Sequence, residues 1–323
     1  MTEGHEGQQD AAPTVTAVVI TYNSADSITS TLALLEAALS SVSAEILVVD
    51  NASEDDTVEL ARSFIHTGRV IANDGNWGYA RAANVGLKHA RGEYTLIMND
   101  DAQLESRTVE RLIEVHRSDS RIGLVGPRIV DSEGNPTHSA RLAYPGPAEE
   151  WMRLGDIVTG SSRGTDYPAT DEPMVVKWLI AACVLGETEQ LRQVGGFNEE
   201  FFLYCEDIDL GRRLSALGLD SVTVPDAVCV HIGGVATEKT HTADARTRRQ
   251  VKGRSVYYRL WLPRLARSLV YLRRAIGIHG QPDRLRMFLP LVFWDGPSLH
   301  HKRFPAPLTP ALGREPSPSE RPE

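Results

Sequence analysis

The densest group of reactive side chains in this sequence is the acidic run Glu206, Asp207 and Asp209, which follows an aromatic stretch. The stretch reads Gly195-Gly-Phe-Asn-Glu-Glu-Phe-Phe-Leu-Tyr-Cys, and leucines recur after the acids at helical spacing. Carboxylates at a helix N-terminus are stabilised as anions, so a base placed there stays ionised at neutral pH. Helix capping is the alternative, but a cap needs one acid. The pattern favours a general base.

Two adjacent carboxylates, Asp100 and Asp101, directly follow an apolar run and Asn99. Paired acids repel each other unless a cation lies beside them. Mg²⁺ or Mn²⁺ prefers such oxygen ligands and commonly shares them with a diphosphate. A solvated turn is the alternative. His231, at the end of a later apolar run, is a further candidate ligand, although a lone histidine is more often packed.

Hydroxyl, amide and carboxylate groups also end two earlier apolar runs. Thr21, Tyr22 and Asn23 end the first, and Asp50 ends the second, shortly before Ser53. These groups suit a nucleoside, because a carboxylate at position 50 can accept hydrogen bonds from a base or a ribose hydroxyl. The alternative is that Asp50 and Ser53 cap the following helix.

Residues 73–86 are rich in Gly, Asn and Ala and lead into a predicted helix. Glycine lets a backbone approach a ligand closely, and helix-start amides together with Arg81 favour a diphosphate. A small-residue helix packed on a sheet is the alternative. The stretch matches neither the dinucleotide fingerprint nor the Gly-Lys-Ser/Thr phosphate loop.

An alternation of strand-like and helix-like segments must position these groups. Strands are predicted at 15–21, 45–50, 69–72 and 94–98, and helices at 28–39, 55–64 and 79–89. This order predicts an α/β fold with a mostly parallel sheet flanked by helices, whose ligands lie beyond the carboxyl ends of the strands. Residues 140–173 read as irregular, and residues 221–230 read as a later strand.

The predicted organisation has four parts. Residues 1–13 and the proline-rich residues 304–323 are predicted to be disordered. Residues 14–240 form the predicted catalytic domain, with a donor half at 14–130 and an acceptor half at 131–240. Residues 241–303 form a basic helical extension.

Charge is unevenly distributed along the 323 residues. Residues 246–303 carry 14 Lys and Arg against two Asp, a balance of +12, which leaves −21 for the rest of a chain whose net charge is −9. The acidic body argues against nucleic-acid binding. The basic, aromatic-rich extension could contact an anionic membrane surface, or pack on the protein or on a second copy in a homo-oligomer.

The cysteine pattern and the hydrophobic pattern predict a cytoplasmic protein. The three cysteines are too far apart for a disulfide framework or a zinc site. The first ten residues hold no apolar run, and no stretch reaches the ~18 to 20 apolar residues of a membrane span.

Six segments, in this order, resemble the large family 2 of inverting glycosyltransferases, and most of all its rhamnosyltransferase branch. They are Val18-Val-Ile-Thr-Tyr-Asn-Ser24, Val48-Val-Asp-Asn-Ala-Ser53, Asn76-Trp-Gly-Tyr-Ala-Arg-Ala-Ala-Asn84, Asn99-Asp-Asp101, the stretch from Gly195 to Leu210, and His231. The resemblance implies the glycosyltransferase A-type fold.

The resemblance also implies roles for individual residues. It places Asp207 as the general base, Asp50 at the donor base or ribose, and Asp101 and His231 at the metal or diphosphate. Substrate contacts are expected from Thr21, Tyr22, Asn23, Asp50, Asn76, Gly78, Arg81, Asn84, Asp100 and Glu206. Asn99 replaces the first Asp of the family's Asp-x-Asp metal motif, and Asp100 stands where this branch often carries proline.

The implied activity is metal-dependent transfer of a sugar, with rhamnose as the branch's donor sugar. The donor is a nucleoside diphosphate sugar, and the acceptor is a glycan or polyprenyl-linked hydroxyl in cell-wall, polysaccharide or glycolipid assembly at the inner membrane face. Two alternatives stay open: a non-catalytic sugar-nucleotide binding module, and a nucleotidyltransferase. The second usually needs a basic Gly-rich loop near the N-terminus, and residues 21–30 offer none.

Overall fold

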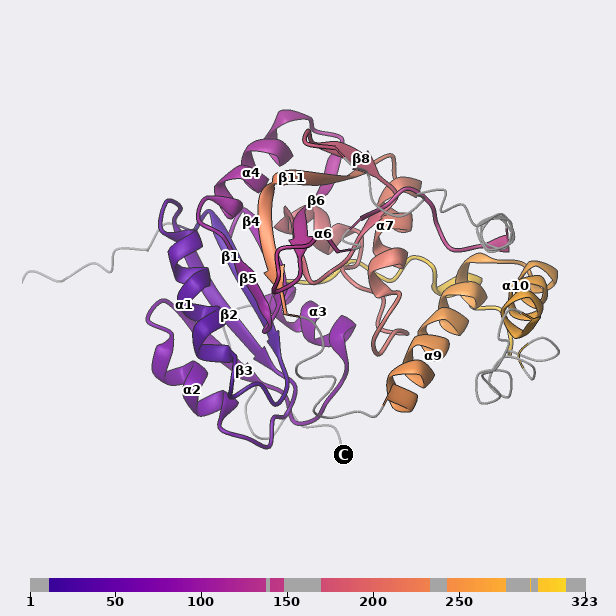
Figure 1. The fold of residues 1–323 in the computed structure, drawn as a ribbon, viewed down its shortest axis with the longest axis horizontal. Helices are drawn as coiled ribbons and strands as arrows, with labels where there is room; N and C mark the ends of the chain where they lie inside the picture. Colours follow the sequence, from indigo (N-terminus) through magenta and orange to yellow (C-terminus); the bar gives the residue numbers. More distant parts are fainter. Residues whose placement is uncertain are drawn as a thin grey trace, which may run out of the picture.

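The computed structural model describes residues 12–137, 140–147, 170–232, 243–276, 291 and 296–311. Its centre is a nine-stranded sheet in the order β3-β2-β1-β4-β10-β6-β11-β5, with β8 paired to β11 (Figure 1). The strands of this sheet are β1 (Val15–Thr21), β2 (Ala44–Asp50), β3 (Gly68–Ala72), β4 (Tyr94–Asn99), β5 (Ala102–Leu104), β6 (Ile122–Val130), β8 (Met174–Val176), β10 (Cys183–Glu187) and β11 (Asp220–His231). Strands β7 (Ala140–Arg141) and β9 (Trp178–Leu179) form a separate pair.

The N-terminal half of the sheet is parallel, as the alternation of strands and helices predicted. Strand β1 pairs in parallel with both β2 and β4, and β2 pairs in parallel with β3. Strand β10 then joins β4 in the antiparallel direction. Because β8, β10 and β11 come from the predicted acceptor half, the two predicted halves share one sheet.

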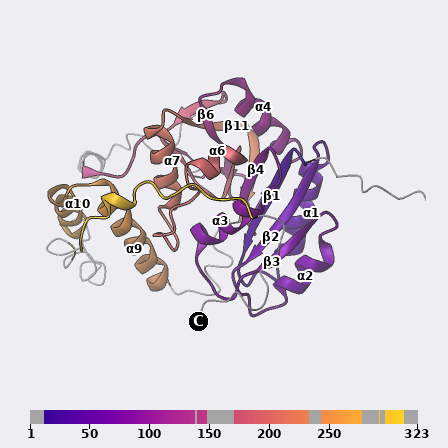
Figure 2. The same cartoon turned by 180° about the vertical axis from the view of Figure 1, so that it is seen from behind.

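Helices cover both faces of the sheet (Figures 1 and 2). Alternate residues of β1 enter different cores: Val18 packs in the cluster that holds α3, and Val19 packs in the cluster that holds α1 and α4. The approach of α3 is close, because a Cβ at Gly86 would lie 2.2 Å from Val18 Cγ1. The helices are α1 (Ile28–Leu39), α2 (Thr57–Phe64), α3 (Tyr79–His89), α4 (Thr108–Ser118), α6 (Thr188–Gln193), α7 (Glu206–Ala216), α9 (Ala243–Trp261), α10 (Arg264–Ile276) and the 3-10 helix η1 (His300–Lys302).

The predicted C-terminal helical extension is present as α9 and α10, and α9 packs on the protein body. Arg212 of α7 donates a hydrogen bond to the Tyr257 hydroxyl at 2.7 Å, and both Tyr257 and Tyr258 are buried. None of the helices in the described ranges is long and apolar enough to cross a membrane.

The chain after α10 returns across the domain, where it is drawn in yellow in Figure 2. Residues 304–311, predicted to be disordered, lie there in a defined path. The Leu308 N–H donates to Arg192 O at 2.9 Å and the Ala311 N–H donates to Lys88 O at 2.8 Å. Composition alone missed this ordering, because the segment's partners are backbone carbonyls at the ends of α3 and α6. Residues 1–11 and 312–323 lie outside the described ranges.

A buried ion pair joins α7 to its surroundings. Arg213 and Asp209 are both fully buried, with Nε and Oδ2 2.8 Å apart. Arg213 also donates to Val194 O and Gly196 O, each at 2.6 Å, and Trp261 Nε1 donates to Asp209 Oδ1 at 2.7 Å. This network connects α7, the Gly195–Gly196 turn and α9, so Asp209 is a structural acid.

Arg213→Met should lower the free energy of unfolding by about 3–5 kcal/mol, because it leaves the Asp209 carboxylate buried without its cation. Urea unfolding followed by circular dichroism measures the change. Arg121→Met is the matched control: its pair with Asp119 is exposed and screened by solvent, so its loss should leave the free energy of unfolding nearly unchanged. Equal losses in the two variants would contradict the structural role of the buried pair.

Candidate active site

The carboxyl ends of three neighbouring strands bring the predicted site residues to one edge of the sheet. In the register of the sheet, Thr21 of β1 lies beside Asp50 of β2, and Ile20 lies beside Asn99 of β4. Residues 99–101 therefore follow a strand directly adjacent to the one that ends at Thr21. The parallel pairing alone makes this edge a place where polar side chains converge.

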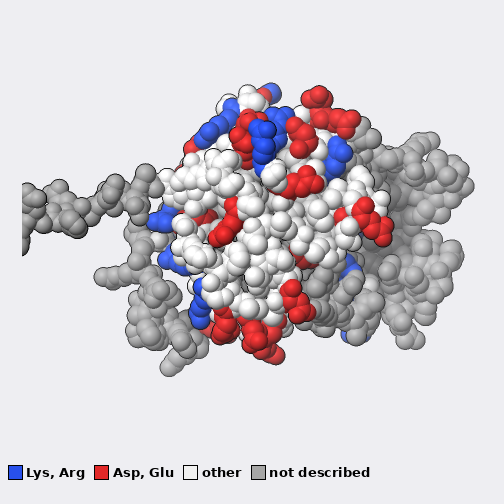
Figure 3. Space-filling model, turned by 60° about the vertical axis from the view of Figure 1, so that its left-hand side comes forward, with Lys and Arg blue, Asp and Glu red and all other residues white. Residues whose placement is uncertain are grey.

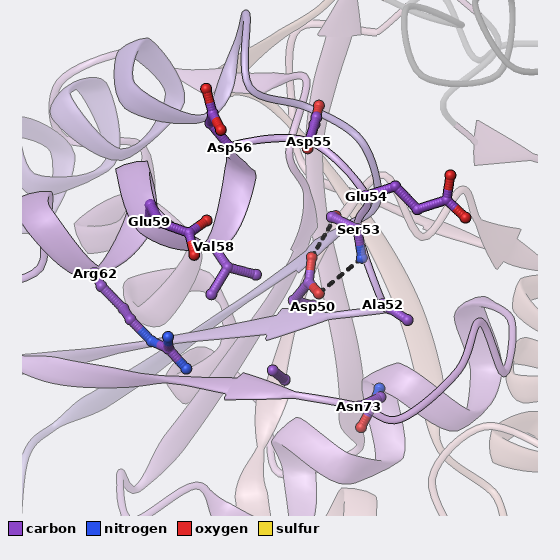
Figure 4. Close-up of a pocket in the computed structure, with 11 residues that line it drawn as sticks. Asp50, Ala52, Ser53, Glu54, Asp55, Asp56, Val58, Glu59, Arg62 and Asn73 are labelled. Atoms are coloured by element: carbon purple, nitrogen blue, oxygen red, sulfur yellow. Dashed lines mark hydrogen bonds between the residues drawn. The ribbon is translucent and has the colours of Figure 1, made fainter.

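An open pocket of about 620 Å³ lies at the end of β2. Figure 4 shows Asp50 at its floor, with Ser53 and the start of α2 on one side and Asn73 on the other. The Asp50 carboxylate accepts hydrogen bonds from the Ser53 N–H at 3.0 Å and from the Ser53 hydroxyl at 2.5 Å. Asp50 therefore shapes this loop and also borders the pocket, so the capping and the binding interpretations are compatible.

The lining of this pocket is strongly acidic. It contains one arginine, Arg62, and five acids: Asp50, Glu54, Asp55, Asp56 and Glu59. Such a lining repels phosphate groups but offers acceptors to the N–H and O–H groups of a base and a ribose. A nucleotide bound at this edge would thus place its nucleoside here and its phosphates further along, towards β4.

The loops after β1 and β2 are tied together by short polar contacts. The Asn23 N–H donates to Ser53 Oγ at 2.9 Å, and the Glu54 N–H donates to Asn23 Oδ1 at 2.8 Å. The Asp100 carboxylate accepts the Tyr22 N–H at 3.2 Å and also the Ser24 hydroxyl. Burial raises the pKa of Asp100 to about 6, and the charge of Asp101 adds to the rise. Asp100 thus holds the β1 loop, a role that its place beside Asp101 did not reveal.

The glycine-rich stretch before α3 contacts the aromatic turn before α7. Gly78 has φ 84°, and a Cβ there would lie 2.2 Å from Phe202 O. The Tyr79 N–H donates to the same oxygen at 2.7 Å, so this helix-start amide already has a protein partner. The Asn76 side chain accepts the Gly78 N–H at 3.1 Å. The stretch therefore sets the path of residues 201–205.

Arg81 and Asn84, the other residues of this stretch that were predicted to contact substrate, differ in solvent exposure. Arg81 is exposed, and its Cζ lies 4.0 Å from the centroid of the Trp77 ring. Asn84 is buried: its Nδ2 donates to Phe197 O at 2.7 Å and to Glu199 Oε1 at 3.0 Å, and its Oδ1 accepts the Phe197 N–H at 2.8 Å. Arg81 remains open to a diphosphate, whereas Asn84 supports the turn after Gly196.

The two residues predicted to hold a metal lie together. His231 Nε2 is 3.0 Å from Asp101 Oδ1 and 3.2 Å from the Asn99 side-chain nitrogen. Asp101 Oδ1 is buried and has no hydrogen-bond partner of acceptable geometry within the described part of the chain. An imidazole nitrogen beside an unsatisfied carboxylate oxygen fits a divalent cation. Among the described residues no third His, Cys, Asp or Glu joins them, so a cation here would need ligands from a diphosphate or water.

Glu206 and Asp207 begin α7 on the other side of Tyr79. Burial raises the pKa of Tyr79 far above its usual value, and the charges of Glu206, Asp207 and Asp100 add to the rise. The charges of these acids thus act on the same ring, although Asp101 and Asp207 do not line the pocket at Asp50. Of the predicted site residues Asp50, Asp101 and Asp207, only Asp50 lines this pocket, and the shared role of the three stays a prediction.

The two acids at the start of α7 have different environments. Burial raises the pKa of Asp207 to about 6, while the N–H of Ile208, 2.8 Å away, and the charge of Arg254 oppose the rise. Burial and the neighbouring Asp207 charge raise the pKa of Glu206 well above its usual value. Burial thus disfavours the charged form of both acids, and only Asp207 has both a backbone N–H and an arginine charge that favour its carboxylate.

Turnover should therefore depend on pH through Asp207. If the ionised carboxylate is the base, kcat/KM should fall about tenfold per pH unit below about pH 6 and be level above it. Rates measured from pH 4.5 to 8 check this, with melting temperatures recorded at each pH to exclude unfolding. A rate that rises on acidification would contradict the assignment.

Arg254 and Tyr79 were not identified from the sequence. Arg254 belongs to the basic extension, whose charge was noted, but its closeness to Asp207 depends on how α9 packs. The Tyr79 hydroxyl donates to Ala181 O, a contact between distant parts of the chain. The basic run from Arg246 to Arg254 was the one sequence feature that could have indicated Arg254.

Solved structures with the same architecture identify the class. The chain aligns with the crystal structure of GalNAc-T7 with UDP, GalNAc and Mn²⁺ at a TM-score of 0.60 and 14% identity, covering 88% of this chain and 55% of that one. It aligns with the mannosyltransferase PcManGT from Pyrobaculum calidifontis, in complex with GDP-Man and Mn²⁺, at a TM-score of 0.50 and 19% identity, covering 88% and 70%. The nine-stranded sheet with helices on both faces thus has the glycosyltransferase A-type fold.

Sequence comparison narrows the class to a family. The model for glycosyl transferase family 2 matches residues 16–167. The chain is 31% identical over 207 residues to the N-acetylglucosaminyl-diphospho-decaprenol L-rhamnosyltransferase of Mycobacterium tuberculosis, and the match covers 58% of this chain and 66% of that protein, just under two thirds. It is 24% identical over 229 residues to the low-salt glycan biosynthesis hexosyltransferase Agl10 of Haloferax volcanii, covering 68% of each. Residues 16–167 thus resemble glycosyl transferase family 2, and the chain is similar to the mycobacterial rhamnosyltransferase.

Proposed function

We propose that this chain is an inverting glycosyltransferase that moves rhamnose from a nucleoside diphosphate donor to a hydroxyl of a lipid-linked glycan acceptor in cell-wall assembly. The observation that carries the proposal is Asp207, a half-buried carboxylate at the start of α7 with a pKa of about 6. The similarity to the mycobacterial rhamnosyltransferase, whose name describes a diphospho-decaprenol acceptor, supports the choice of sugar and acceptor.

In the proposed reaction, Asp207 removes the proton of the acceptor hydroxyl as the oxygen attacks the anomeric carbon opposite the departing diphosphate. This single displacement inverts the sugar carbon and needs no enzyme nucleophile. An ionised aspartate is a weak base for an alcohol. Because the transition state resembles an oxocarbenium ion, however, the hydroxyl becomes more acidic as the new bond forms, and proton transfer can be late.

Other residues of the site would orient the two substrates. Glu206 is buried and its Oε2 has no hydrogen-bond partner among the described residues, so it is open to a hydrogen bond with a sugar hydroxyl. The pocket at Asp50 would take the donor nucleoside, and exposed Arg81 would meet its diphosphate. Asp101 and His231 would hold a Mg²⁺ or Mn²⁺ ion, which supplies charge neutralisation at the leaving diphosphate when bound.

Release of nucleoside diphosphate from a panel of nucleotide sugars tests the proposal and its alternatives. We expect dTDP-rhamnose to be consumed fastest, with transfer to a diphospho-lipid-linked N-acetylglucosamine acceptor. A nucleotidyltransferase would release or consume pyrophosphate instead, and a binding module would show saturation without turnover. Binding of several donors with no product from any of them would overturn the enzymatic assignment.

We further propose that the protein works at the inner face of the cell membrane, through α10. Leu265, Leu269 and Leu272 share one face of this helix and are 75%, 40% and 39% exposed. The sequence of α10 has four arginines and no acid, in keeping with an anionic lipid surface. The face of the body drawn in Figure 3, by contrast, shows no continuous basic patch, and acids gather along its lower edge.

The double variant Leu265→Asp, Leu269→Asp should lower the partition coefficient onto vesicles of phosphatidylglycerol and phosphatidylcholine by at least about tenfold, because it replaces apolar contact with charge. Vesicle co-sedimentation measures this. Leu217→Asp, at a 54% exposed leucine beside α7, is the matched control and should leave binding unchanged. Failure of the unaltered chain to sediment with the vesicles would end the membrane proposal. That copies of this chain form a homo-oligomer remains a prediction from the sequence.

A further inference from the structure

A second cavity, of about 250 Å³, lies between α9 and the aromatic turn that precedes α7. The helix approaches this turn with its backbone, because a Cβ at Gly253 would lie 2.4 Å from Tyr204 O. Arg249 lies over the turn, with its Cζ 5.2 Å from the centroid of the Phe202 ring. Lys252 lines the same cavity and is exposed. One face of a basic helix and a turn of the catalytic domain thus enclose a shaped cavity.

The charge of this cavity is positive. Its lining contains two cations, Arg249 and Lys252, and one acid, Glu200. The Glu200 carboxylate is already paired with Lys302, 2.5 Å away. Within the described ranges neither Arg249 nor Lys252 forms an ion pair. Two cations beside buried Phe201 and Val256 favour an anion with several oxygens, which a guanidinium and an ammonium can bond together.

Adjacent residues of α9 contact the cavity and act on the proposed base, because Gly253 lines the cavity and the charge of Arg254 acts on Asp207. Arg254 follows Gly253 on α9, and its charge acts on Asp207. Arg249 lies five residues before Arg254, about 7.5 Å along the helix axis. The cavity and the arginine whose charge acts on Asp207 therefore belong to neighbouring turns of the same helix.

We propose that this cavity binds the diphosphate of an acceptor whose sugar is joined through that diphosphate to a lipid, so that the sugar extends towards Asp207. The inference rests on the proposed function and adds the place where the acceptor is held. It gives the basic extension a part in acceptor binding, separate from the donor pocket at Asp50. It also accounts for cations on the face of α9 that packs against the catalytic domain.

Isothermal titration with two probes tests the inference. The first is an N-acetylglucosaminyl diphosphate ester of a short-chain alcohol, and the second is the same sugar and alcohol joined without the diphosphate. Nucleoside diphosphate and Mg²⁺ are present in excess to fill the donor site. Arg249→Ala with Lys252→Ala should weaken binding of the first probe by at least about tenfold, since two charge-assisted contacts are lost, and leave the second unchanged.

Arg248→Ala is the matched control, because Arg248 is an exposed neighbour on the same helix that does not line the cavity, and it should bind both probes like the unaltered chain. Equal affinity of the unaltered chain and the double variant for the first probe would overturn the inference, as would no binding to the unaltered chain. Donor hydrolysis without acceptor should be equal in all three proteins. If none of the three proteins hydrolyses the donor, that result would count against the proposed function alone, because the titration does not depend on turnover.

Discussion

Asp207→Asn is expected to lower kcat by about 10²- to 10⁴-fold, the usual contribution of a positioned general base. The amide has nearly the same shape, and its oxygen can still accept the Ile208 N–H that now lies 2.8 Å from Asp207 Oδ1. It cannot accept the proton of the acceptor hydroxyl. Donor affinity should change little, because the pocket at Asp50 does not include this residue. Steady-state kinetics with donor and acceptor varied separately give both values.

The control for this variant is Asp226→Asn, which removes an exposed carboxylate of β11 that pairs with Arg111 on the surface. It should retain full turnover. The residual activity of Asp207→Asn should also lose the decline below about pH 6 that the ionisation of Asp207 produces. Near-normal turnover in Asp207→Asn, with its pH profile intact, would show that another group is the base.

Removal of divalent metal is expected to abolish measurable transfer, and Mn²⁺ or Mg²⁺ should restore it. Neutralising charge at a leaving diphosphate contributes several kcal/mol, so the rate in chelator should fall by at least about 10²-fold. The reason lies in the residues present: Asp101 Oδ1 is buried without a hydrogen-bond partner among the described residues, and His231 Nε2 is 3.0 Å from it. Assays in EDTA, followed by titration with each metal, measure the effect.

Substitutions of Asp101 and His231 test whether the metal ion acts at these two residues. Asp101→Asn and His231→Ala should each raise the Mn²⁺ concentration for half-maximal activity by about tenfold or more. His66→Ala removes an exposed histidine whose contact is Glu36, and should leave that concentration unchanged. Full activity in chelator would contradict a cation site at Asp101 and His231. An unchanged Mn²⁺ requirement in both variants would contradict it as well.

Much of the fold was predictable because its N-terminal half follows simple periodicity. The apolar runs that end at Thr21 and Asp50 became adjacent parallel strands, as the alternation with helices indicated. The C-terminal half was harder. Strand β10 inserts between β4 and β6, and both of those pairings join distant segments in antiparallel fashion. Residues 304–311 were misjudged because proline content describes a free chain, whereas backbone carbonyls of α3 and α6 supply partners there.

In the candidate site, too, the sequence predicted some features and missed others. Asp101 and His231 lie close together, since each ends or follows a strand at one edge of the sheet, and their role as metal ligands stays a prediction. The separate roles of Glu206, Asp207 and Asp209 were not separable along the chain. Asp209 faces Arg213 and Trp261, Asp207 lies within reach of Arg254, and Glu206 is left without a partner among the described residues.

The amino-acid sequence by itself determined the α/β class and the types of side chain that could do chemistry, because these follow from periodicity and from residue type, and its motifs carried the resemblance to a family. Only the tertiary structure gives these carboxylates their different environments. Burial, hydrogen-bond partners and neighbouring charges set each pKa, and all three depend on residues far away in the chain. Asp207, Asp209 and Asn84 obtain their roles from contacts with α9, α7 and the Gly195–Glu199 turn, which no local pattern describes.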